Sequence, residues 1–152
     1  MKYELFWGGP FSNFYPCKIT VDGLEFNTTE QYFMFKKAIT FGDFGTAVEI
    51  FISTEPKEQK KLGRRVEGFR EDIWNRVARD FMFRANMAKY TQNDSLRSIL
   101  CRTKLPLVEA SPYDKIWGVG LGADNPDVQD KDKWQGQNWL GEILTEIRDI
   151  IR

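Results

Sequence analysis

A helical repeat of apolar residues over about residues 70–89 constrains the fold of this chain more than any other feature. The repeat needs an α-helix to bring its members onto one face, because neighbours on a helix are three or four residues apart. Its members are Ile73, Val77, Phe81, Ala85 and Ala88. We expect this longest helix to be the scaffold of the core.

Turn and capping residues divide the rest of the chain into short elements. Asp22-Gly23 is typical of a two-residue hairpin turn, here between strands over 17–21 and 24–26. Caps and glycine stops predict five more helices, and Pro106 places a strand near it at a sheet edge. The predicted helices cover about 28–40, 43–53, 54–63, 94–102 and 138–152, and the further strands cover 2–6 and 105–109. We expect a turn-rich loop over 111–122 and an exposed excursion over 123–137.

These elements predict an α+β fold. We expect residues 1–152 to form a single compact, helix-rich domain with a small N-terminal β-hairpin or antiparallel sheet. The length leaves room for one hydrophobic core and no second domain.

Composition excludes several kinds of function. The chain has 22 basic and 22 acidic residues, so no basic excess points to non-specific binding of nucleic acid or membrane. It has no histidine and only two cysteines, Cys17 and Cys101, which removes the usual catalytic triads, most zinc sites and any disulfide framework. We expect no metal and no cofactor, with the chemistry carried by carboxylates, lysine, hydroxyls and aromatic rings. No run approaches the ~18 apolar residues of a membrane span and no signal peptide is apparent, so we expect a cytoplasmic protein.

The stretch 27–37 places charge on an apolar helix face. In a helix, Glu30 and Lys37 share a face with Phe33 and Met34. A charged side chain that points into the interior is energetically costly, so it needs a partner of opposite charge or a functional role. Two structural alternatives exist. Asn27 through Glu30 has the spacing of a capping box, in which Glu30 only satisfies the backbone, and Lys37 could be a solvated surface lysine.

Other candidates also have structural alternatives. Asp114 with Trp117 and Gly118 could hold a carboxylate beside a stacking ring, or could be a turn aspartate with a tryptophan in the core. Trp74 lies inside the longest helix, where a core role is the default.

Three polar residues are candidates for binding substrate. Arg64, beside Gly63, could bind phosphate or be solvated. Ser12 and Asn13, between two phenylalanines, could bind sugar hydroxyls or form a plain turn.

The order of these motifs resembles that of the NADAR superfamily, also called YbiA-like, over almost the entire chain. The motifs run Phe11-Ser12-Asn13-Phe14, Thr29-Glu30-Gln31-Tyr32-Phe33 with Lys37, Leu62-Gly63-Arg64, Trp74, Asp114-x-x-Trp117-Gly118, and Asn138-Trp139-Leu140-Gly141. The resemblance implies a compact α+β domain that hydrolyses N-glycosidic bonds of ribose derivatives. Members are associated with removing ADP-ribose from guanine in nucleic acid and with cleaving phosphoribosylamino intermediates of riboflavin synthesis.

The resemblance also implies residue roles. The family's catalytic glutamate falls on Glu30, its helix lysine on Lys37 and its active-site tryptophan on Trp74, while its Asp and Trp-Gly fall on Asp114, Trp117 and Gly118. There are two departures: relatives commonly have histidine where this chain has Gln31, and the excursion over 123–137 is longer than in compact members.

A mechanism follows as a hypothesis. Breaking a ribose C1–N bond builds positive charge on the sugar and negative charge on the base. Glu30 would stabilise the sugar or activate water, and Asp114 would orient the ribose hydroxyls or relay a proton. Lys37 would donate a proton or, by a second route, form a Schiff base with the opened sugar. The remaining residues would bind substrate: Trp74 and Trp117 the base, Arg64 a phosphate, Ser12 and Asn13 sugar or phosphate, with Gly118 in the loop that lines the pocket.

The expected partner is a small ribose-phosphate or ADP-ribosyl molecule, or ADP-ribosylated nucleic acid. One alternative is a non-catalytic module that binds ADP-ribose or NAD. Another is an interaction protein with an exposed aromatic patch.

Overall fold

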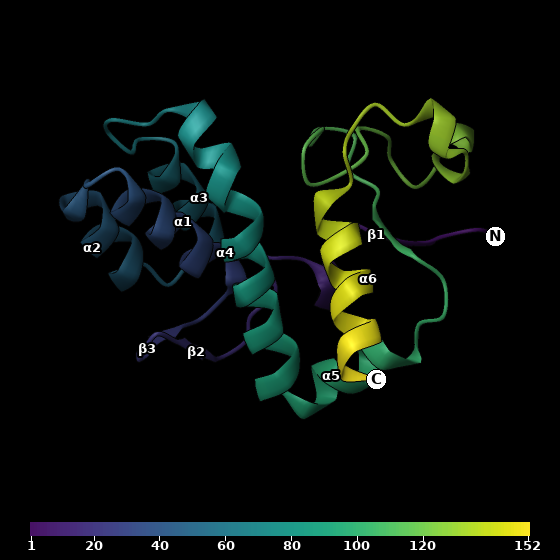
Figure 1. The fold of residues 1–152 in the computed structure, drawn as a ribbon, viewed down its shortest axis with the longest axis horizontal. Helices are drawn as coiled ribbons and strands as arrows, with labels where there is room; N and C mark the ends of the chain where they lie inside the picture. The colour runs from purple at the N-terminus through teal and green to yellow at the C-terminus, as the bar shows by residue number, and fades with distance from the viewer. The chain divides into compact units, whose positions relative to one another are not determined.

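The computed structural model describes all 152 residues and contains six α-helices, three short 3-10 helices and two two-stranded sheets (Figure 1). Its contacts divide the chain into two compact units. The central unit is residues 13–93, and the terminal unit is residues 1–12 with residues 94–152. None of the helices has the length and apolarity needed to cross a lipid bilayer.

The central unit begins with an antiparallel hairpin and continues with four helices. Its elements are β2 (Ile19–Val21), β3 (Leu24–Phe26), α1 (Thr29–Thr40), α2 (Phe44–Ile52), α3 (Pro56–Gly63) and α4 (Glu71–Gln92). Ile19 pairs with Phe26 and Val21 with Leu24. Asp22 and Gly23 both have positive φ, at 54° and 78°, as the predicted two-residue turn requires.

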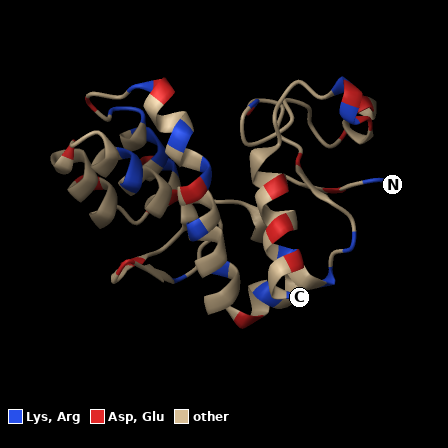
Figure 2. Ribbon diagram, viewed as in Figure 1, with Lys and Arg blue, Asp and Glu red and all other residues tan.

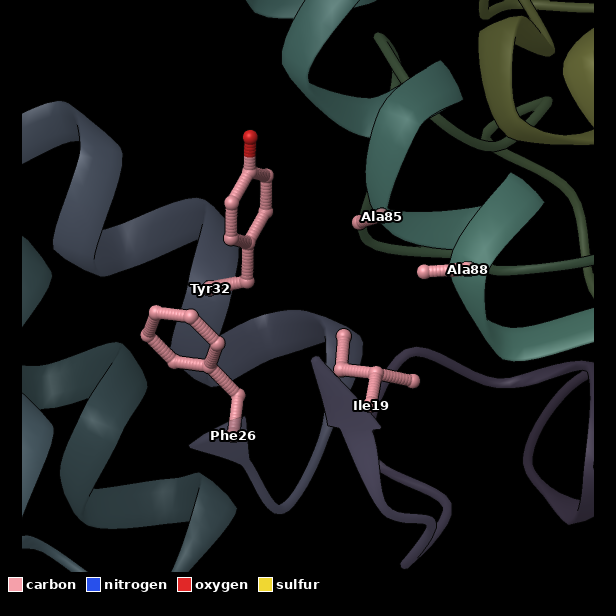
Figure 3. Packing of buried hydrophobic residues seen from close by; sticks show 5 residues of the cluster. All are labelled: Ile19, Phe26, Tyr32, Ala85 and Ala88. Atoms are coloured by element: carbon pink, nitrogen blue, oxygen red, sulfur yellow. The ribbon is translucent and has the colours of Figure 1, made fainter. Parts of the chain in front are cut away.

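The longest helix is the scaffold that the apolar repeat predicted. Ala85 and Ala88 of α4 form a buried cluster with Tyr32 of α1 and with Ile19 and Phe26 of the hairpin (Figure 3). Helix α1 also contacts α2 and α3, so three helices surround it. The helix that carries Glu30 and Lys37 is therefore packed against every other helix of this unit.

The terminal unit combines the two ends of the chain. Its elements are β1 (Glu4–Phe6), η1 (Gly9–Phe11), α5 (Asp94–Arg102), β4 (Leu107–Glu109), η2 (Pro126–Gln129), η3 (Lys131–Lys133) and α6 (Trp139–Ile151). Strand β1 pairs with β4 in parallel, with Leu5 opposite Val108. Helix α6 packs on β4 and α5.

The structure confirms the predicted N-terminal hairpin and adds a separate parallel pair of strands about one hundred residues apart, which no local pattern reveals. It corrects the prediction that 123–137 is an exposed excursion, because this segment is only partly exposed. Val128 is buried, and Trp134 donates its Nε1–H to the Val128 carbonyl at 2.8 Å while its ring packs on Tyr3 at 5.0 Å between centroids. These contacts anchor the excursion.

Candidate functional site

The N-terminus of α1 is capped by the side chain of Thr28, and Gln31 contributes a second hydrogen bond. Thr28 is the N-cap, and its side-chain oxygen accepts a hydrogen bond from the Gln31 N–H at 2.9 Å. Gln31 in turn accepts the Asn27 N–H through Oε1 at 2.7 Å. Thr28 is therefore the N-cap, and Gln31 reaches back to the N–H of the residue before that cap. A backbone-capping role for Glu30 stays an alternative.

Gln31 also ties α1 to the end of α2. Its Nε2 donates to the carbonyls of Ile50 at 3.1 Å, Phe51 at 2.9 Å and Ser53 at 3.1 Å. The side chain is 3% exposed. Gln31 is thus a buried structural amide.

The first turn of α1 fixes Asn13 beside Glu30. The Glu30 N–H donates to the Asn13 carbonyl at 3.1 Å, and the Thr29 hydroxyl donates to Asn13 Oδ1 at 2.8 Å. With Oδ1 engaged, Nδ2 is the half of the amide that can donate to a ligand. Ser12 belongs to the terminal unit, where it ends η1 and donates its N–H to the Gly9 carbonyl.

The predicted helix face does point inward. Glu30 is 7% exposed, Phe33 4% and Met34 8%, and Lys37 is half-buried. Burial lowers the pKa of the Lys37 ammonium below its ordinary value, the Glu30 carboxylate acts in the opposite direction, and the Arg64 guanidinium lowers the pKa further. Glu30, Lys37 and Arg64, each predicted separately, are therefore coupled electrostatically within the central unit.

Gly63 allows the end of α3, which carries Arg64, to pack closely on α1 near Lys37. Gly63 ends α3 and is buried, and a Cβ there would overlap the Met34 sulfur on α1. The two helices pack where one has no side chain. Arg64 follows as the exposed C-cap of α3, within the basic run Lys60, Lys61, Arg64 and Arg65 (Figure 2).

Sequence reasoning missed Phe69. Its ring lies under the Lys37 ammonium, with Nζ 4.5 Å from the ring centroid. Phe69 lies in the connection between α3 and α4 and is 42% exposed. An aromatic residue in a connecting segment gives no periodic signal, so nothing in the sequence distinguished it.

Trp74 has the packing of a core residue. It is 7% exposed, and its ring lies 5.0 Å from Phe33, 5.9 Å from Phe81 and 6.4 Å from Phe41 between centroids. These contacts match the core alternative, and stacking of Trp74 on a leaving base stays a prediction.

In the terminal unit, Asp114 shapes its own loop. Its Oδ1 accepts the N–H groups of Ile116 at 2.9 Å and Trp117 at 2.8 Å, while the Ser111 hydroxyl accepts the Asp114 N–H at 3.1 Å. This is the turn role that the sequence left open. The bonds use one carboxylate oxygen, so Oδ2 is the atom that can meet a ligand.

Gly118 and Trp117 pack within the same unit. A Cβ on Gly118 would come within 2.9 Å of the Asp114 carbonyl and 3.0 Å of the Glu109 carbonyl, so the chain's own backbone occupies the space that the missing side chain leaves. The ring of Trp117 meets Trp139 edge to face at 5.4 Å. The loop thus packs against its own backbone and against α6.

Asn138 holds this loop against the sheet. Its Oδ1 accepts the Glu109 N–H at 3.0 Å, its Nδ2 donates to the Leu107 carbonyl at 3.1 Å, and its backbone N–H donates to Gly118 at 3.0 Å. Its φ of 55° is left-handed, which asparagine tolerates better than most residues. The Asn-Trp-Leu-Gly motif therefore has a structural explanation. No three His, Cys, Asp or Glu side chains are grouped in a way that would hold a metal ion.

Comparison with known proteins decides the family. Residues 5–152 match the model of the NADAR domain. The chain belongs to the NADAR family. It is 40% identical to Protein irg-1 of Caenorhabditis elegans, over 93% of this chain and 74% of that protein. It is 39% identical to an N-glycosidase of Acanthamoeba polyphaga mimivirus, over 91% of this chain and 85% of that protein.

Two further NADAR relatives bear on fold and substrate. The NMR structure of Escherichia coli YbiA matches with a TM-score of 0.80 and 29% identity, over 99% of this chain and 84% of that chain, which confirms the predicted α+β fold. YbiA is itself named an N-glycosidase. The chloroplastic riboflavin biosynthesis protein PYRR of Zea mays is 31% identical over 94% of this chain, which covers 23% of that longer protein.

Proposed function

We propose that the protein hydrolyses the bond between C1 of a ribose phosphate and a base nitrogen, with Glu30 and Lys37 as its catalytic pair. The reaction class comes from the family: as a NADAR protein whose relatives are named N-glycosidases, the chain is a hydrolase of N-glycosyl compounds. One observation carries the assignment of residues. Glu30 and Lys37 share a mostly buried face, with Arg64 close enough to lower the pKa of Lys37.

The roles follow from the charges that develop. As the C1–N bond breaks, its electron pair goes to the base nitrogen, which takes a proton from the Lys37 ammonium. Water adds to C1 and gives its proton to the Glu30 carboxylate, whose negative charge also stabilises the cationic sugar. The Arg64 guanidinium, exposed beside Lys37, supplies the charge to bind a substrate phosphate.

The remaining assignments rest on the family resemblance and on the atoms that local structure leaves available. Asn13 would donate through Nδ2, and Asp114 would accept ribose hydroxyls through Oδ2. Trp117 would stack on the base. Ser12, Trp74 and Gly118 are proposed as binding residues on the resemblance alone. We also propose that the protein works in the cytoplasm.

Two substrates fit this chemistry: guanine that carries ADP-ribose, and a phosphoribosylamino-pyrimidine of riboflavin synthesis. The name of the maize relative favours the second. Each should be incubated with the protein and release of the base followed by mass spectrometry. Release from one of them identifies the substrate, whereas recovery of both intact after long incubation would contradict these two assignments; tight binding without cleavage would indicate the binding module.

A pair of neighbouring lysines tests the role of Lys37. Lys37→Arg keeps the positive charge but makes a poor proton donor and cannot readily form a Schiff base, so turnover should fall at least tenfold. Lys36→Arg is the matched control, because Lys36 pairs instead with Asp22 at 3.4 Å. Equal turnover in the two variants would remove Lys37 from the mechanism.

A further inference from the structure

Phe69 is held so that one face of its ring meets the Lys37 ammonium. The segment that carries it turns at Gly68, whose φ is 78°, and the ring of Phe69 then packs against Phe41 at 5.3 Å between centroids. Phe41 is the C-cap of α1, so the ring is braced by the same helix that carries Lys37. The contact between the Phe69 ring and the Lys37 ammonium therefore depends on the turn at Gly68 and on the packing of Phe69 against Phe41.

The charged groups around Lys37 are few. Glu30 faces it from α1 and Arg64 from the end of α3. Arg70, next to Phe69, is paired with Asp72 at 2.9 Å, and Lys36 is directed to Asp22. Burial lowers the pKa of Lys37 most strongly, and the electron-rich face of an aromatic ring opposes burial by attracting a cation.

We propose that Phe69 is a positioning residue for Lys37, whose ring face holds the ammonium in place and favours its charged, proton-donating form. This rests on the proposed function only in assigning Lys37 to catalysis. The consequence is that the proton-donor route is favoured over the Schiff-base route, which needs the neutral amine.

Three substitutions distinguish attraction of the ammonium to the aromatic ring face from mere exclusion of water by an apolar side chain. Phe69→Leu keeps an apolar side chain over Lys37 but removes the π face, so the pKa of Lys37 should fall by about half a unit to one unit. Phe69→Trp keeps the face and should leave the pKa unchanged or raise it. Phe69→Ala lets water reach the ammonium, which should raise the pKa. If Phe69 only excluded water from Lys37, Phe69→Leu would leave the pKa of Lys37 unchanged.

The pKa of Lys37 can be measured without any substrate. The full-length protein is acetylated briefly at a series of pH values, and modification of the Lys37 peptide is quantified by mass spectrometry. Phe44→Leu is the matched control, since Phe44 is a phenylalanine that is 64% exposed on α2, and it should leave the profile unchanged. An unchanged profile in Phe69→Leu, or a shift in the same direction as Phe69→Ala, would overturn the proposal.

Activity adds a second readout. If Lys37 donates a proton, turnover falls as pH rises through its pKa, and Phe69→Leu should move this alkaline limb to lower pH by the same amount while leaving KM unchanged at lower pH. A limb that stays in place although the acetylation profile shifts would contradict the link to catalysis. A shifted acetylation profile in a protein without N-glycosidase activity would keep the role of Phe69 in holding the ammonium and refute the proposed function.

Discussion

Replacing Gln31 with methionine should weaken folding far more than replacing its neighbour Glu30. Methionine has a similar length but neither donates through Nε2 nor accepts through Oε1. Gln31 has two amide hydrogens and one engaged acceptor, so the substitution removes the equivalent of three hydrogen bonds in a side chain that is 3% exposed. At about 1 kcal/mol for each bond, the free energy of unfolding should fall by about 3 kcal/mol.

Glu30→Gln is the matched comparison, because it changes the adjacent residue and keeps the hydrogen bonds of Thr28 and Gln31. It should change the free energy of unfolding by less than about 1 kcal/mol, since the amide nearly preserves the shape of the carboxylate. Equilibrium unfolding in urea, followed by tryptophan fluorescence, measures both variants. A loss below about 1 kcal/mol in Gln31→Met, or equal losses in the two variants, would refute the separation of a structural Gln31 from a functional Glu30.

Two further predictions concern elements that position the site. Gly63→Ala would place a methyl group on the Met34 sulfur and should destabilise the protein by about 1–3 kcal/mol in the same urea assay. Gly45→Ala is the control: the nearest atom is 3.9 Å from the new Cβ, so a neutral or stabilising effect is expected, and similar losses in both would contradict the packing argument. The Asp43 carboxylate accepts hydrogen bonds from the Glu67 N–H, the Thr46 hydroxyl and the Thr46 N–H, and these bonds lower its pKa in the folded protein below the ordinary value of 3.8. The ionised carboxylate therefore contributes its full stabilisation above pH 3.8, and this contribution is lost as the pH falls through the lower pKa of the folded state. Asp43→Ala should therefore be less stable than the unchanged protein at pH 7, with the difference shrinking at acid pH in unfolding curves; a constant difference would be inconsistent with this origin.

The helices were predictable because their signals are local. The apolar repeat placed α4, and the Asp22-Gly23 turn formed the hairpin. Pairing of β1 with β4 was not predictable, since it depends on contacts between distant segments. The anchoring of 123–137 through Trp134 likewise depends on Tyr3 at the far end of the chain.

The candidate site was predictable in part. Helical spacing placed Glu30 and Lys37 on one face, but only tertiary packing at Gly63 explains why Arg64 influences Lys37. The hydrogen bond from the Asn27 N–H to Gln31 was not predicted, because the capping-box spacing over Asn27 through Glu30 drew attention to Glu30 instead. Phe69 acts through its position over an ammonium, which no spacing rule encodes.

The most direct test of the account is single-turnover cleavage of the phosphoribosylamino-pyrimidine and of ADP-ribosylated guanine by Glu30→Gln. The account predicts that the variant folds and binds substrate while base release falls by about a hundred- to ten-thousandfold. Release at the rate of the unchanged protein would contradict the role of Glu30 and with it the proposed mechanism.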